Sequence, residues 1–160
     1  MPKFKNILYA TDLSHSAPHA FGYAMMLAKQ FDAHMTVLYV IERLATMEES
    51  IITSYLGKDA TDAINKSKEE DAMKEMAIRV EDFFCKEGDH PVDTNQVTFK
   101  VDRGYPEDEI LKHAKDYDLI VMGTHEKGFT HTFLGSVTKR VLRRSRTPVF
   151  VVPLIKALDK

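Results

Sequence analysis

The chain has little cysteine: Cys85 is the only one among its 160 residues. A single cysteine excludes a disulfide framework and a zinc site made of cysteines alone. A domain of this length buries roughly 70% of the surface that its unfolded chain exposes, so it needs neither disulfides nor metal to fold. We therefore expect an ordinary apolar core, with Cys85 packed as a helix residue beside Phe83 and Phe84.

Long apolar runs and an excess of one charge are also absent. No run of 18 apolar residues occurs and the mean hydropathy is −0.28, which argues against a membrane-spanning helix. The basic, then apolar start reaches Thr11 and Asp12 too soon to hold a signal-peptide core. A net charge of −2 does not suit a protein that coats nucleic acid through bulk charge. These absences predict a cytoplasmic protein without a membrane or nucleic-acid partner.

Strand and helix patterns alternate along the chain. Short apolar stretches rich in strand formers predict five strands, at residues 3–10, 34–41, 97–101, 118–122 and 148–152. Helical spacing of apolar residues and helix-start signals predict four helices, at residues 17–31, 61–86, 106–117 and 135–144. Residues 42–58 follow no regular pattern, apart from a turn expected at Gly57. This alternation predicts an α/β fold with a parallel sheet and helices on both faces.

Ligands in such folds bind beyond the carboxyl ends of the strands, where the strand order reverses. The loops after the first, second and fourth strands, residues 10–16, 40–43 and 122–135, are therefore expected to form the site. Asp12 follows the first strand and can accept hydrogen bonds from a base amino group or a ribose hydroxyl. The same carboxylate can instead cap the turn that follows it.

The strongest local pattern is the glycine-containing loop from Gly123 to Gly135, which ends at a predicted helix start. Unpaired N–H groups and the helix dipole make such a start an anion site, and the Ser136 hydroxyl adds a donor. The pattern also fits a simple turn. It is not a P-loop, because no Gly-Lys-Ser or Gly-Lys-Thr follows. The dinucleotide fingerprint is absent after the first strand, and Asp12 lacks the neighbouring acid of a phosphoacceptor domain.

Five segments then occur in order along the chain: ILYATDLS at 7–14, VLYV at 37–40, GYPEDEI at 104–110, DLIVMGTH at 118–125, and GSV at 135–137 leading to TPVFVV at 147–152. Together they resemble the universal stress protein family over nearly the whole chain. The resemblance implies a single doubly wound, Rossmann-like domain of the adenine nucleotide alpha hydrolase-like type over residues 1–155. Its five-stranded sheet would have the strand order 3-2-1-4-5, and residues 156–160 would form a short tail.

The resemblance also implies a site for an adenine nucleotide, ATP, ADP or AMP, whose phosphates can recruit Mg²⁺. The residues that it assigns to the base and ribose are Ala10, Thr11, Asp12 and Val40. Those that it assigns to the ribose and phosphates are Met122, Gly123, Gly135, Ser136, Val137 and Thr138. His125 and Gly128 of the glycine loop complete the expected set.

One departure from the family's nucleotide-binding pattern lies in this loop. The pattern has a second glycine where this chain has Glu126, and the span from Gly123 to Gly135 is one residue short. Gly128 can partly substitute for that glycine, but the Glu126 carboxylate would repel phosphate. Two alternatives to a nucleotide-binding sensor therefore stay open: a dimeric interaction module without nucleotide, and a slow ATPase with His125 or Glu126 near the phosphates.

Three other features have simpler interpretations. The basic residues between 139 and 146 are interpreted as cations near a helix C-terminus, which the dipole favours. His15 and His19, four residues apart, are interpreted as surface histidines. Residues 148–152 are predicted to be an edge strand, and an apolar edge invites pairing with a second copy. The resemblance likewise implies a homodimer built through this strand.

Overall fold

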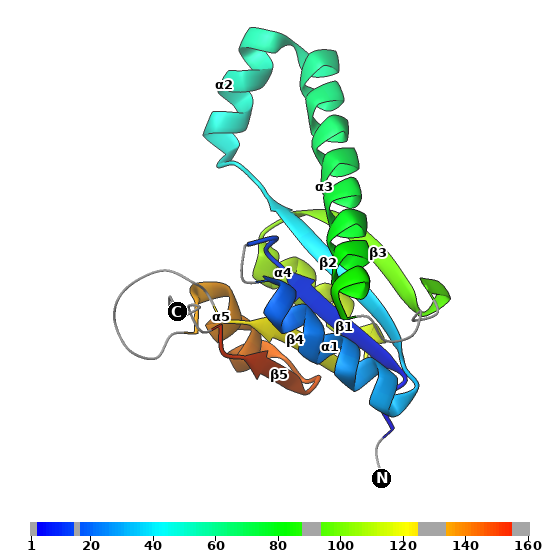
Figure 1. Cartoon of the computed structure of the whole chain (residues 1–160). Coiled ribbons are helices and arrows are strands. Elements are labelled where there is room, and N and C mark those ends of the chain that lie inside the picture. The colour runs from blue at the N-terminus through cyan, green and yellow to red at the C-terminus, as the bar shows by residue number, and fades with distance from the viewer. Residues whose placement is uncertain (1–2, 15–16, 88–93, 125–133, 155–160) are drawn as a thin grey trace, which may run out of the picture.

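The computed structural model describes residues 3–14, 17–87, 94–124 and 134–154. Its five strands form one parallel sheet in the order β3-β2-β1-β4-β5 (Figure 1). The strands are β1 (Asn6–Thr11), β2 (His34–Glu42), β3 (Val97–Gly104), β4 (Leu119–Gly123) and β5 (Val149–Val152). This sheet confirms the predicted fold class, the strand order and the edge position of the last strand. The tail predicted at residues 156–160 lies outside the described residues.

Helices cover both faces of the sheet (Figure 1). The helices are α1 (Ala17–Phe31), α2 (Thr46–Leu56), α3 (Lys58–Glu87), α4 (Pro106–His113) and α5 (Ser136–Arg144), with 3-10 turns η1 (Thr94–Gln96) and η2 (Ala114–Asp116). Helices α1 and α3 pack on one face, and α4 and α5 pack on the other. None of the helices in the described part of the chain is long and apolar enough to cross a membrane.

The central strand shows why the predicted strands read as continuous apolar runs. Ile7 and Tyr9 belong to the core cluster under α1 and α3, whereas Leu8 belongs to the cluster under α4 and α5. Successive side chains of a strand point to opposite faces, so a strand covered on both faces needs apolar residues at every position. The two clusters are therefore separate cores that share one sheet.

The structure corrects the prediction for residues 42–58. The segment contains α2, and α3 begins at Lys58 rather than at residue 61. Met47, Ile51 and Tyr55 recur at helical spacing in this segment, but no residue of α2 is buried and these side chains are exposed rather than packed on the core. The turn predicted at Gly57 is confirmed: its φ of 81° is a conformation that glycine adopts readily, and it separates α2 from α3.

Two smaller predictions also need correction. The helix predicted at residues 106–117 is shorter in the structure. Helix α4 ends at His113, and the 3-10 turn η2 follows it. Cys85 is exposed rather than packed. Phe83 and Phe84 pack against the α1 and α3 core, where both rings contact Phe21. Each residue turns a helix by about 100°, so the position after this aromatic pair points away from the core.

Asp118 offers a test of how β4 holds the start of β1. Its carboxylate accepts hydrogen bonds from the backbone N–H groups of Lys5 at 2.8 Å and Asn6 at 2.9 Å, and these bonds lower the pKa of Asp118. Asp118→Ala is expected to lower the free energy of unfolding at pH 7 by about 1 kcal/mol, since solvent weakens charge-assisted bonds at the surface. Urea denaturation measures this difference.

The expected pH dependence follows from the direction of the shift. A carboxyl group whose pKa is lower in the folded state stabilises the fold above its unfolded pKa of about 3.9. That stabilisation is lost as the pH falls through the lower, folded value. The difference between wild type and Asp118→Ala should therefore shrink in acid, and a deficit that persists unchanged at about pH 2 contradicts the assignment.

Candidate functional site

A cavity of about 610 Å³ opens at the carboxyl ends of the central strands. Small-molecule sites typically have volumes of about 300 to 1,000 Å³. Strand β1 pairs with β2 on one side and with β4 on the other, so the strand order reverses where the cavity lies. The ends of β1, β2 and β4 all line it, as the topological rule predicts.

Most residues of the predicted site meet in this cavity. The predicted residues that line it are Ala10, Thr11, Asp12, Val40, Met122, Gly123, Gly135, Ser136, Val137 and Thr138. They come from four separate stretches of the chain, which the parallel sheet and α5 bring to one edge. His125 and Gly128, together with Glu126, lie outside the described residues.

The turn after β1 forms one rim of the cavity. The Ser14 N–H donates to Asp12 Oδ1 at 2.9 Å, and the Leu13 N–H donates to Thr11 Oγ1 at 3.1 Å. Leu13 has a φ of 57°, so these two side-chain bonds support a backbone conformation that is uncommon for leucine. The sequence allowed two roles for Asp12, ligand binding or capping of the turn. In the structure its side chain caps the turn and also lines the cavity.

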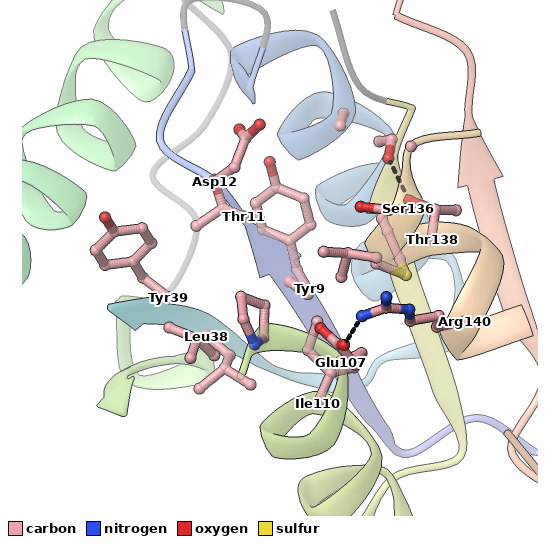
Figure 2. A pocket seen from close by; sticks show the side chains of 18 of the residues that line it. Tyr9, Thr11, Asp12, Leu38, Tyr39, Glu107, Ile110, Ser136, Thr138 and Arg140 are labelled. Atoms are coloured by element: carbon pink, nitrogen blue, oxygen red, sulfur yellow. Dashed lines mark hydrogen bonds and ion pairs between the residues drawn. The ribbon is translucent and has the colours of Figure 1, made fainter. Parts of the chain in front are cut away.

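Tyr9 fixes the position of this rim relative to α1. Its ring is only 2% exposed, and its hydroxyl donates to the Ala17 carbonyl at 2.9 Å. Burial raises the pKa of Tyr9 well above its usual range, so the phenol stays a neutral donor. Figure 2 shows Tyr9, Thr11 and Asp12 on one side of the cavity, rising from the end of β1.

The opposite ends of the cavity differ in chemistry. Leu38, Tyr39 and Val40 of β2 form a mainly apolar wall with an aromatic ring. Across the cavity, Ser136 and Thr138 lie at the start of α5 (Figure 2). An apolar wall that faces a polar helix start suits a ligand with a flat apolar part and an anionic part.

The start of α5 has the geometry of an anion site. Gly135 is the N-cap residue and offers no side-chain cap to the first turn. The N–H groups of such a first turn have no partner within their own helix. The buried Thr138 hydroxyl donates to the Gly123 carbonyl at 3.2 Å and so ties the helix start to the end of β4. Ser136 is exposed and lines the cavity.

Helices α4 and α5 are joined across the cavity wall by charge. Arg140 forms an ion pair with Glu107, which is buried, and Arg144 pairs with Asp108 at 2.8 Å (Figure 2 shows the first pair). Two members of the basic group at 139–146 therefore have partners in the acidic first turn of α4, beyond the helix-end interpretation made from the sequence. Glu107 and Arg140 both line the cavity, so this pair fixes the wall without adding net charge to it.

Sequence reasoning missed the contribution of the loop after β3. Tyr105, Pro106, Glu107 and Ile110, at and after the end of β3, line the cavity. The available signal was the topology itself, because all parallel strands end at the same edge of a sheet. Only the loops after the first, second and fourth strands were predicted to contribute.

The chain also matches known proteins. Residues 3–153 match the universal stress protein family. Universal stress protein MJ0577 of Methanocaldococcus jannaschii is 32% identical over 156 residues, which cover 93% of this chain and 94% of that protein. The solved structure of MJ0577 superposes with a TM-score of 0.72 at 25% identity, covering 98% of this chain and 100% of that one.

Two more distant solved structures contain nucleotides. A universal stress protein in complex with cAMP is 21% identical with a TM-score of 0.59, covering 96% of this chain and 100% of that chain. The universal stress protein from Archaeoglobus fulgidus in complex with dAMP is 20% identical with a TM-score of 0.55, and the match covers 94% of this chain and 98% of that chain. At these identities the two structures show that this chain shares their fold.

Proposed function

Because the chain belongs to the universal stress protein family, we propose that its cavity binds an adenine nucleotide and that the protein acts as a nucleotide-dependent sensor or regulator in a stress response. The observation that carries the proposal is the cavity itself, which joins an apolar wall on β2 to the open start of α5 at the point where the strand order reverses. The cAMP and dAMP complexes of proteins with this fold support the adenine part.

The proposed ligand orientation follows from the two ends of the cavity. The base lies against β2, with the Val40 backbone at its edge, and Asp12 accepts hydrogen bonds from the base or ribose. The ribose passes Met122 and Gly123 at the end of β4. The phosphates meet the first-turn N–H groups of α5 and the Ser136 hydroxyl, where the helix dipole favours negative charge. Mg²⁺ would be held mainly by the phosphates.

The decisive experiment asks whether the purified protein carries or binds a nucleotide. The full chain is denatured, and the released material is separated by chromatography. Calorimetric titrations with ATP, ADP and AMP follow on nucleotide-free protein. We expect an adenine nucleotide in the first measurement, or binding of one per chain in the second. No nucleotide in either measurement favours the interaction module, and phosphate release above background favours the slow ATPase.

Asp12 offers a test of the ligand orientation. Asp12→Ala is expected to weaken nucleotide binding about tenfold, because one charge-assisted hydrogen bond contributes about 1.5 kcal/mol. Asp12→Asn keeps an acceptor for the Ser14 N–H and separates this effect from damage to the turn. Asp59→Ala, on the first turn of α3, is the control and should leave affinity unchanged. An unchanged affinity in Asp12→Ala contradicts the orientation.

We also propose that the protein is cytoplasmic, and that it forms a homodimer through β5, as the family resemblance implies. Strand β5 is at the sheet edge, and the side chain of its Phe150 is exposed. Such an edge can pair with the same edge of a second copy. Light scattering coupled to size exclusion should give about twice the 18.3 kDa of one chain. A strict monomer at micromolar concentration contradicts the dimer.

A further inference from the structure

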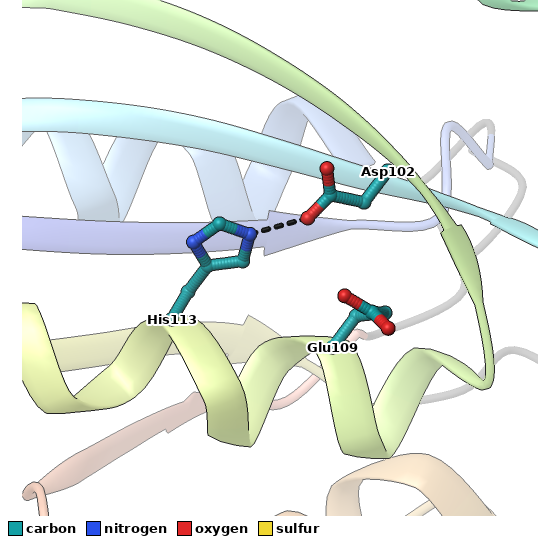
Figure 3. A group of neighbouring side chains, drawn as sticks. All are labelled: Asp102, Glu109 and His113. Atoms are coloured by element: carbon teal, nitrogen blue, oxygen red, sulfur yellow. Dashed lines mark hydrogen bonds and ion pairs between the residues drawn. The ribbon is translucent and has the colours of Figure 1, made fainter.

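Three metal-ligating side chains meet between β3 and α4, outside the nucleotide cavity. They are Asp102, Glu109 and His113, and their ligand atoms all lie within 4.8 Å of one another (Figure 3). No other group of three or more such side chains is found in the part of the chain that the structure describes. None of the three lines the nucleotide cavity.

The local structure explains why these side chains converge. Glu109 and His113 are four residues apart on α4, so both lie on one face of the helix. On the neighbouring strand, Val101 packs into the core under α1 and α3, so the next residue, Asp102, points to the opposite face, where α4 lies. Figure 3 shows the two helix side chains reaching towards Asp102. The three groups therefore stand on two regular elements rather than on a loop.

Each carboxylate of the group has a basic neighbour and is partly shielded from solvent. His113 Nε2 pairs with Asp102 Oδ2, and Lys112 Nζ lies 3.2 Å from Glu109 Oε2. The Glu109 carboxylate lies against the backbone of Gly104, where a Cβ would come within 2.9 Å of Oε1. The three side chains are 29%, 20% and 17% exposed, whereas Lys112 is 70% exposed. A cation placed between the two partly desolvated carboxylates would be attracted by both of them.

We propose that Asp102, Glu109 and His113 form a binding site for a divalent transition-metal ion of the zinc class, with water completing the coordination. One imidazole and two carboxylates are donors that Zn²⁺ accepts, and three protein ligands plus water is a common zinc arrangement. Magnesium and calcium prefer oxygen donors alone. Around a tetrahedral ion with bonds of about 2.0 to 2.1 Å, ligand atoms lie about 3.4 Å apart. To reach that spacing, the hydrogen-bonded atoms of His113 and Asp102 have to move apart, and ligand atoms farther apart than about 3.4 Å have to approach each other.

Calorimetric titration of the full chain with ZnCl₂, after treatment with a chelator, tests the proposal. The wild type is expected to bind one zinc ion per chain at this site. Asp102→Asn, Glu109→Gln and His113→Ala should each weaken binding at least tenfold. His19→Ala, an exposed histidine on α1, is the matched control and should leave binding unchanged. A hundredfold excess of MgCl₂ should not displace the zinc.

X-ray absorption at the zinc edge provides a readout that needs no variant. The zinc-loaded wild type should show one imidazole with oxygen ligands. Two or more imidazoles would assign the zinc to another site, such as the pair His15 and His19, and would overturn the proposal. The absence of binding at millimolar zinc would overturn it as well, and so would an unchanged affinity in His113→Ala. Circular dichroism identifies any variant that has lost its fold. In that case the X-ray absorption spectrum of the zinc-loaded wild type decides whether the zinc is bound at this site.

Discussion

Replacing Ser136 by aspartate is expected to weaken ATP binding at least a hundredfold while leaving the fold at least as stable. Ser136 is the first residue of α5 and follows the N-cap Gly135. A carboxylate at this position gains about 0.3 to 1 kcal/mol from the helix dipole. The same charge would lie beside the phosphates, and two like charges about 4 Å apart repel by about 4 kcal/mol near a protein surface. That repulsion corresponds to a loss of about a hundredfold to a thousandfold in affinity.

The Ser136→Asp experiment separates folding from binding. Thermal unfolding should show an equal or higher midpoint, and calorimetric titration should show the loss of affinity. Ser136→Asn, which is polar and uncharged, is the control and should lose far less. The loss should be larger for ATP than for AMP, because ATP brings more negative charge to the helix start. An ATP affinity that survives the substitution would mean that the phosphates do not lie at α5.

The largest expected effect on stability comes from Leu8→Ala. Leu8 is fully buried in the central strand, in the cluster that α4 and α5 cover. Strand β1 pairs on both sides, so the backbone around Leu8 has little freedom to collapse into the space left by the missing atoms. We expect a loss of about 3 to 4 kcal/mol in the free energy of unfolding, from lost burial and the residual cavity. For a chain of this size the melting temperature should fall by roughly 10 °C.

An exposed residue on α2 provides the control for this prediction. Met47 is 77% exposed, on a helix without buried residues, and Met47→Ala should change stability by no more than about 0.5 kcal/mol. Denaturant unfolding of both variants measures the contrast. A Leu8→Ala loss of less than about 1 kcal/mol would mean that the α4 and α5 face is not a tightly packed core.

The nucleotide and zinc proposals can fail independently, although both involve α4. Pro106, Glu107 and Ile110 of this helix line the cavity, whereas Glu109 and His113 face β3. No residue is shared between the two sets. If the wild type binds no zinc, the nucleotide proposal is therefore unaffected. If the protein binds no nucleotide, the zinc proposal is likewise unaffected.

The sequence by itself determined the architecture of the sheet. Continuous apolar strands such as residues 34–41 imply cover on both faces, and regular alternation with helices implies parallel pairing. These patterns also indicate which edge of the sheet holds the ligand site, because parallel strands end together. Asp12 and Ser136 could be placed at that edge because each stands next to the end of a predicted element.

Only the tertiary structure decided the features that depend on which elements become neighbours. The apolar residues of α2 stay exposed, and Cys85 points to solvent because Phe83 and Phe84 are the residues of this turn that meet α1. The pairs Glu107–Arg140 and Asp102–His113 join different elements. Local patterns record how each element meets the core, since burial selects the residue type at each position. They do not record which polar side chains of two packed elements face each other, because that depends on the position and rotation of both elements.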